Sequence, residues 1–114
     1  MSPVDEYVMV GKAMADPTRV RILAALSVRG LCVCELVQLM DLGQPAISRH
    51  LGILREAGLV DDVRDGKFVN YRLRRPARTA FAAAMVRGLI ESQRDDPEFD
   101  ELREQARVVD RFLL

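Results

Sequence analysis

The chain has 114 residues, of which 49% are hydrophobic and 30% charged, and its formal net charge is zero. This composition excludes a disordered chain and a coiled coil, and the length suits one compact domain that would gain stability by pairing with a second copy. The longest apolar run, Ala80–Val86, is too short to cross a bilayer, and the N-terminal stretch has acidic residues where a signal peptide needs basic ones. We therefore expect a cytoplasmic protein with no membrane partner.

Positive charge is concentrated in the middle of the chain. Residues 44–75 contain seven basic and four acidic side chains, whereas residues 76–114 contain six and eight. Proteins that bind nucleic acid use Lys and Arg to neutralise phosphates, so a zero net charge alone would argue against one. The uneven distribution instead predicts a basic surface on the central segment, with the compensating negative charge in the tail.

The first half of the chain has the apolar spacing of helices. One helix is predicted over residues 4–15, and a second begins at Pro17 with Asp16 as its N-cap and ends near Gly30. A short third helix begins at about Val33.

A fourth helix is predicted after the break DLGQP. Pro45 is expected at its first position, and Gly58 at the C′ position that ends it. This spacing turns Ile47, Leu51 and Leu54 inward. Two helices joined by a tight turn that contains Gly, the second with a polar outer face, are typical of a helix-turn-helix.

The segment after these helices reads as a β-hairpin. Asp65-Gly66 is the favoured dipeptide of a two-residue type I′ turn, and the second arm alternates apolar and polar residues. Basic residues stand at its tip and edges, namely Arg64, Lys67 and Arg72. Further helices are predicted over residues 77–93 and 98–112.

These elements predict a mostly α fold with a small β-hairpin, in the α+β class. Residues 1–114 form a single winged helix-turn-helix DNA-binding domain, with the helix-turn-helix at about 33–57 and the wing at about 59–74. The expected partner is double-stranded DNA. A two-fold dimer would read an inverted repeat.

Helical geometry selects the residues that face DNA. From the buried Ile47, turning 100° per residue, Pro45, Ser48 and Arg49 point outward, with Gln44 at the N-terminal tip. Arg49 can bridge a guanine edge, Gln44 can read adenine, and Ser48 can bind a base or a phosphate. His50, the only histidine, lies on the flank of this helix without His, Cys or Asp neighbours at ligand spacing. We expect it to donate to a phosphate or a backbone carbonyl rather than to bind a metal.

Cys32 and Cys34 are the only cysteines, and a reducing compartment favours free thiols, metal ligands or redox sensors over a disulfide. Their spacing is not that of a zinc knuckle and no second pair exists, so zinc is disfavoured. Residues i and i+2 of a helix point about 200° apart, so both sulfurs reach one ion only if the helix starts between them. The helix dipole and Arg29 are expected to lower the thiol pKa values and favour soft, thiophilic ions.

The segments ADPTRVRIL, LCVCEL, QPAISRHLGILREAGLV and DGKFVNYRL, over about residues 10–75, resemble the ArsR/SmtB family of winged-helix metal-sensing repressors. LCVCEL is similar to the arsenic-sensing branch, in which vicinal cysteines at the start of the third helix bind arsenite or antimonite. The resemblance implies a homodimer through the first and fifth helices, here about 4–15 and 77–93. It also implies a transcriptional repressor that leaves its operator when As(III) or Sb(III) binds Cys32 and Cys34, with no cofactor required.

Two features of the sequence depart from the pattern of this family. Val37 occupies the position of a third cysteine in the best-known members, so the third ligand would be water, a small thiol or a group from elsewhere in the dimer. Residues 77–95 have no His, so we exclude the family's zinc or nickel site on the fifth helix.

Other functions stay open. The alternatives are a thiol redox or sulfur-species sensor that uses Cys32 and Cys34, and a module that mediates protein contacts. An enzyme is disfavoured because one histidine and no convergent carboxylates offer no catalytic set.

Overall fold

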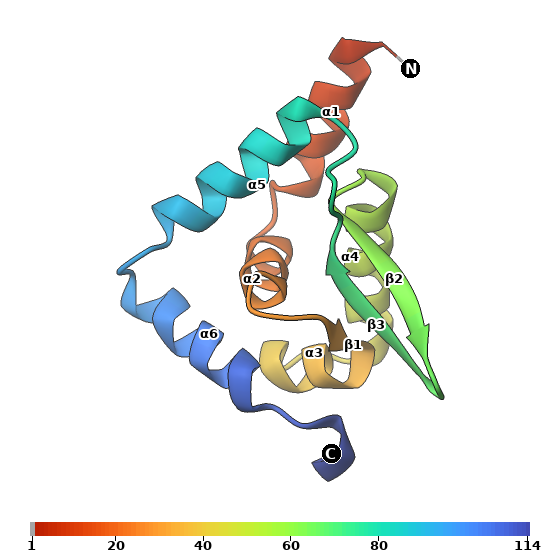
Figure 1. Ribbon diagram of the computed structural model, residues 1–114, viewed down its shortest axis with the longest axis vertical. Coiled ribbons are helices and arrows are strands. Elements are labelled where there is room, and N and C mark those ends of the chain that lie inside the picture. Colours follow the sequence, from red (N-terminus) through yellow and green to blue (C-terminus); the bar gives the residue numbers. More distant parts are fainter. Residues whose placement is uncertain (1) are drawn as a thin grey trace.

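Figure 1 shows the computed structural model, which describes residues 2–114. The elements in chain order are α1 (Pro3–Ala13), α2 (Pro17–Leu26), β1 (Leu31–Cys32), α3 (Val33–Met40), α4 (Gln44–Glu56), β2 (Val60–Asp65), β3 (Phe68–Leu73), α5 (Ala80–Ser92), α6 (Pro97–Val108) and the 3-10 turn η1 (Arg111–Leu113). Helix α2 lies at the centre, α3 and α4 lie beside it, and the ribbon of β2 and β3 extends away from the helices (Figure 1). This is the winged helix-turn-helix of the α+β class that the sequence predicts. Within residues 2–114 no helix is long and apolar enough to cross a membrane.

The predicted helix boundaries agree with the local chemistry at two sites. The Asp16 side chain accepts a hydrogen bond from the Arg19 backbone N–H and caps α2, with Pro17 as the first helical residue. Gly58 follows α4 with a φ of +77°, the left-handed conformation expected at C′. Helix α4 begins one residue earlier than predicted, because Gly43 takes the N-cap position and Pro45 becomes the second helical residue.

The inward face of α4 is as predicted. Ile47, Leu51 and Leu54 are fully buried, and they belong to one core cluster with Ile22 of α2 and Leu36 of α3. Helix α3 packs against α4, and α6 packs against α2. The two helices of the helix-turn-helix are therefore fixed to one another by the core, with the outer face of α4 left free.

The hairpin turn differs from the prediction. β2 and β3 are antiparallel and Asp65 pairs with Phe68, so the two turn residues are Gly66 and Lys67. Gly66 has a φ of +62°, whereas Lys67 has no positive φ, and a type I′ turn needs positive φ at both positions. The type I′ prediction at Asp65-Gly66 is therefore wrong by one residue, and the sign pattern is that of a type II′ turn, which places Gly first.

A third strand was not predicted from the sequence. β1 is only two residues long and pairs antiparallel with β3, Leu31 opposite Tyr71 and Cys32 opposite Asn70. A segment this short carries no alternation that a pattern could reveal. Its pairing makes Cys32 part of the same sheet as the wing.

The last two predicted helices have different limits. Helix α5 starts at Ala80 rather than at residue 77, because the Thr79 side chain accepts from the Ala82 N–H and acts as the N-cap. Helix α6 ends at Val108 rather than at residue 112. Val109 is extended, and the Asp110 side chain then caps η1 by accepting from the Phe112 N–H.

Gly58→Ala is predicted to lower the free energy of unfolding by about 1–2 kcal/mol or more, because a side chain at positive φ is strained. A Cβ there would also lie 2.8 Å from the Arg78 guanidinium group. The matched control is Gly52→Ala in α4, where a Cβ meets no atom within 4 Å. It should stabilise the protein by about 0.5–1 kcal/mol through helix propensity. Urea unfolding at one fixed protein concentration compares the two, and equal effects would contradict the assigned backbone conformation.

Candidate thiol site and nucleic-acid interface

The two cysteines lie at the junction of β1 and α3. Cys32 is the last residue of β1 and the N-cap of α3, with extended backbone, and Cys34 lies in the first helical turn. Both thiols are free, and their Sγ atoms lie 2.6 Å apart. The helix starts between them, as the sequence requires if both sulfurs are to reach one ion. The site thus presents two adjacent sulfur donors.

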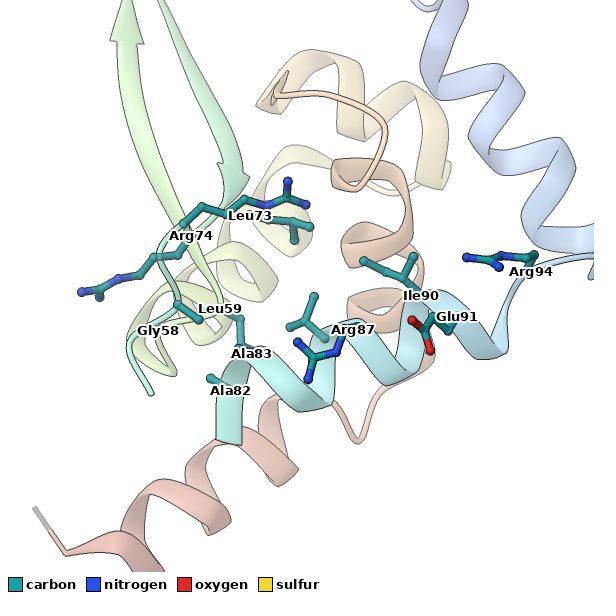
Figure 2. A pocket seen from close by; sticks show the side chains of 13 residues that line it. Gly58, Leu59, Leu73, Arg74, Ala82, Ala83, Arg87, Ile90, Glu91 and Arg94 are labelled. Atoms are coloured by element: carbon teal, nitrogen blue, oxygen red, sulfur yellow. The ribbon is translucent and has the colours of Figure 1, made fainter. Parts of the chain in front are cut away.

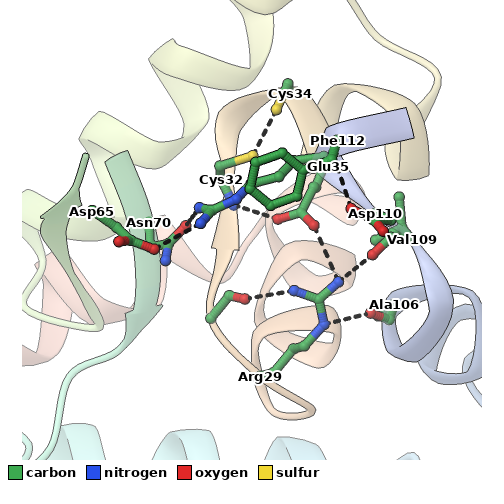
Figure 3. A network of polar contacts seen from close by, with 12 residues as sticks. Arg29, Cys32, Cys34, Glu35, Asp65, Asn70, Ala106, Val109, Asp110 and Phe112 are labelled. Carbon is green, nitrogen blue, oxygen red and sulfur yellow. Dashed lines mark hydrogen bonds and ion pairs between the residues drawn. The ribbon is translucent and has the colours of Figure 1, made fainter. Parts of the chain in front are cut away.

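A buried carboxylate fixes the start of α3. Glu35, 3% exposed, accepts a hydrogen bond from the Cys32 backbone N–H at 2.9 Å with one oxygen. Its other oxygen lies 3.1 Å from Arg29 Nη2. Arg29 also donates to the carbonyl oxygens of Gly30, Ala106 and Val109, and so ties the beginning of α3 to the end of α6 (Figure 3). The Cys-x-x-Glu spacing has the form of an N-terminal capping pattern, a signal that could have identified Glu35 from the sequence.

The predicted lowering of both thiol pKa values is wrong for Cys32. Burial of Cys32, which is 2% exposed, together with the neighbouring Cys34 thiol and Glu35 carboxylate, raises the pKa of its thiol to about 12, against a smaller lowering by a backbone hydrogen bond from Glu35. Arg29 does not offset this effect, because its guanidinium group is bound to Glu35 and to backbone carbonyls. Cys32 is therefore a protonated thiol at neutral pH, and an ion that binds it must displace that proton.

The C-terminal segment packs against the wing beside the thiol site. The Arg111 guanidinium group donates to Asn70 at 3.1 Å and to Asp65 at 2.7 Å (Figure 3). It also stacks over the Phe68 ring, at 4.2 Å from the ring centroid. The Phe112 ring meets Phe68 edge to face. These contacts join residues more than 40 positions apart in the chain, so no local pattern in the sequence could have predicted them.

Four of the predicted DNA contacts share the first two turns of α4. Gln44, Pro45, Ser48 and Arg49 are all exposed. Within residues 2–114 the Arg49 side chain makes no ion pair, so its guanidinium group is free for a ligand outside the chain. The structure brings these four residues together on one surface.

The basic residues of the wing differ in their availability. Arg64 and Lys67 are exposed, and the Lys67 ammonium group lies 5.4 Å from the centroid of the Phe68 ring. Arg72 instead forms an ion pair with Asp61 on the neighbouring strand, at 2.8 Å. The count of basic residues in the sequence therefore overstates the positive charge that the wing presents.

His50 is turned toward α2 rather than toward the outer face of α4. Its Nδ1 lies 3.1 Å from Arg19 Nη1, and its side chain is 13% exposed. Because a guanidinium group has only donors, Nδ1 accepts, and the ring can donate only from Nε2. Burial lowers the pKa of His50, with Arg19 and Arg49 acting in the same direction against Asp16. His50 thus sets the position of α4 on α2, and any contact to a phosphate would have to come from Nε2.

The chain also has a mainly apolar pocket of about 410 Å³ between α5 and the base of the wing (Figure 2). Its walls include Leu59, Leu73 and Ile90, and arginines stand at its edge. It contains neither Cys nor His and lies apart from the thiols. Among residues 2–114 no group of three His, Cys, Asp or Glu side chains could hold a metal ion.

The fold and this surface define a class of protein: a winged helix-turn-helix DNA-binding transcriptional regulator. Residues 16–62 match the family model described as "Bacterial regulatory protein, arsR family". The chain is 43% identical over 96 residues to the arsenic resistance transcriptional regulator ArsR1 of Pseudomonas putida, covering 83% of this chain and 74% of that protein. It is 50% identical over 76 residues to the arsenical resistance operon repressor of Escherichia coli, covering 66% and 64%.

A solved structure agrees with these sequence matches. The crystal structure of the transcriptional repressor BigR from Xylella fastidiosa aligns with a TM-score of 0.66 at 34% identity, covering 78% of this chain and 84% of that chain. The chain therefore belongs to the ArsR family, as the motifs predict, and members of that family are transcriptional regulators rather than enzymes.

The environment of Cys32 predicts unequal thiol reactivity. At pH 8 iodoacetamide should modify the half-buried Cys34 first and Cys32 much more slowly, because the reactive thiolate of Cys32 is scarce when its pKa is about 12. Glu35→Gln removes the negative charge beside Cys32, lowers its pKa and should speed its modification about tenfold for each unit of pKa. Glu101→Gln, at an exposed position of α6, is the control. Mass spectrometry of the peptides measures the rates, and equal rates at both thiols would contradict the assignment.

Proposed function

We propose that this chain is a transcriptional repressor that leaves its operator when arsenite or antimonite binds Cys32 and Cys34. The observation that carries the proposal is the pair of free thiols 2.6 Å apart at the start of the helix that packs against α4. Adjacent thiols suit soft, thiophilic ions. The two relatives named above are both regulators of arsenic or arsenical resistance, which supports this choice of inducer.

The coupling to DNA runs through Cys32. This residue belongs to β1, which pairs with the wing strand β3, and it also caps α3, which packs against α4. An ion held by both sulfurs would fix their relative position and shift the start of α3, which would alter the angle between α4 and the wing. A coupling free energy of about 1–3 kcal/mol is enough to change operator affinity several-fold to a hundredfold.

The repressor is proposed to act as a homodimer through α1 and α5 on an inverted repeat. Val4, Tyr7 and Val8 of α1 are about half or more exposed, and the Tyr7 ring contacts the Phe81 ring of α5 in a tilted arrangement with ring centroids 4.8 Å apart. Ala84 and Gly88 are exposed on α5. Apolar side chains grouped in this way favour a second copy of the same surface.

Arg49→Ala is predicted to weaken binding to the promoter DNA upstream of the gene by about 1–3 kcal/mol, the value of a bidentate contact to a base. Arg72→Ala should cost less, because Asp61 already neutralises Arg72. Fluorescence anisotropy with labelled DNA at one salt concentration compares the two variants. Equal losses would show that α4 does not read the bases through Arg49.

Arsenite is predicted to release the reduced protein from the same DNA at one equivalent per protomer. Cys32→Ser and Cys34→Ser should bind the DNA as tightly as the unmodified protein and stay bound when arsenite is added. Stepwise titration followed by anisotropy measures this. Release by peroxide or persulfide but not by arsenite would instead support a redox or sulfur-species sensor. Failure to bind any DNA at low salt would support a protein-contact module.

A further inference from the structure

The pocket between α5 and the base of the wing has no part in the proposed repressor mechanism. Its volume is about 410 Å³, and apolar side chains line it from two sides. Leu59 precedes the first strand of the wing and Leu73 ends the second, whereas Val86 and Ile90 belong to α5. This volume and these walls are in the range of small-molecule sites in proteins.

Positive charge surrounds the apolar walls. The residues that line the pocket include four arginines and one glutamate, which gives a formal charge of +3. The arginines are Arg74, Arg75, Arg87 and Arg94, and all of them are exposed. Within residues 2–114 none of the four makes an ion pair. A guanidinium group binds a carboxylate through two parallel hydrogen bonds, so these side chains are suited to an organic anion.

The pocket lies on the side of α5 away from the surface proposed for the dimer. Ala84 and Gly88, which belong to that surface, are each two residues from Val86. Two residues turn a helix by about 200°, so Val86 faces nearly the opposite way. We therefore expect a dimer formed through α1 and α5 to leave the pocket open to a ligand.

The pocket side of α5 is not completely packed by the chain itself. Val86 and Ile90 are only half-buried. Gln93 follows Val86 by two helical turns on the same side of α5 and is 4% exposed. Among residues 2–114 neither polar atom of its side-chain amide has a hydrogen-bond partner. Buried amides are normally paired, so the unpaired Gln93 shows that this side of α5 has room for a further group.

We propose that this pocket binds a carboxylate with an apolar body, of the size of an aromatic acid. The apolar body would lie against Leu59, Leu73 and Val86 and lose its contact with water. The carboxylate would bind Arg87, which extends from α5 beside the pocket (Figure 2). A nucleic-acid phosphate could meet the arginines but has no apolar body to fill the pocket. The site is separate from Cys32 and Cys34, and the inference goes beyond the proposed repressor function.

The test compares three probes that separate charge from apolar contact. The probes are 2-naphthoate, 2-naphthalenemethanol, which has the same rings without the charge, and acetate, which has the charge without the rings. Isothermal titration calorimetry with the reduced full chain at pH 7.5 measures each affinity. We expect one 2-naphthoate per protomer, bound about tenfold more tightly than the alcohol, which corresponds to 1.4 kcal/mol. Acetate should show no measurable binding.

Two variants, each with a matched control, locate the ligand. Arg87→Gln should lower the affinity for 2-naphthoate to about that of the alcohol, whereas Arg64→Gln, at an exposed arginine of β2 outside the pocket, should not. Ala83→Phe fills the pocket and should weaken both naphthalene probes at least about tenfold. Val63→Phe, on an exposed part of β2, is its control. Arg87→Gln changes only an exposed side chain, so its result stands even if Ala83→Phe does not fold.

The outcomes are distinct from those that test the repressor. Equal affinities for 2-naphthoate and the alcohol would overturn the assignment of Arg87 and its neighbours to a carboxylate. Binding that survives both pocket variants would place the ligand elsewhere and overturn the proposal. The proposal also fails if neither naphthalene probe binds the dimer, since a second copy would then cover the pocket. Each of these results leaves the release of DNA by arsenite to be decided by its own titration.

Discussion

The ion pair between Glu35 and Arg29 is the contact on which the geometry of the thiol site depends. Glu35 is buried, holds the backbone N–H of Cys32, and is held in turn by Arg29, which also binds the last carbonyls of α6. The Glu35 side chain is 4% exposed and that of Arg29 is 36% exposed, so loss of Arg29 would leave a buried carboxylate without its compensating charge. The pair therefore fixes the residue at which α3 begins, and the start of α3 between Cys32 and Cys34 is what allows the two sulfurs to meet.

This constraint has a chemical consequence for the thiols. The carboxylate that fixes the helix also lies beside Cys32 and disfavours its thiolate, so the site is arranged for geometry rather than for reactivity. A metalloid hydroxide can still bind there, since each thiol proton leaves with a hydroxyl group. A bare divalent cation must expel the protons into solution, which the raised pKa of Cys32 opposes at neutral pH. The local electrostatics thus favour a hydroxylated, trivalent ligand over a simple cation.

The sequence predicted the features that depend on local chemistry. Asp16 as an N-cap, Gly58 at C′ and the inward face of α4 follow from spacing and residue type, and the family is apparent from its motifs. The features that it missed depend on contacts between distant segments. The β1 pairing of Cys32 with Asn70 is one example, and the Arg111 contacts to the wing are another. The raised pKa of Cys32 was missed for the same reason, because the sequence shows Arg29 near the thiol but not that Glu35 already binds the Arg29 guanidinium group.

The ion pairs on α4 and the wing affect how strongly the site of Cys32 and Cys34 would have to act to control DNA binding. Asp61 and Asp62 bind Arg72 and Arg55, so two of the seven basic side chains counted in residues 44–75 are paired within the chain. The other five are exposed and make no ion pair among residues 2–114, but only Arg49, Arg64 and Lys67 of them belong to α4 and the hairpin of β2 and β3. Few phosphate contacts mean a modest electrostatic contribution to affinity and a shallow dependence on salt. Operator binding would then depend on the fit of α4 and the wing to the grooves, and that fit is what a shift at the start of α3 disturbs. A regulator that bound DNA through more phosphate contacts would need a larger coupling free energy to be released from it.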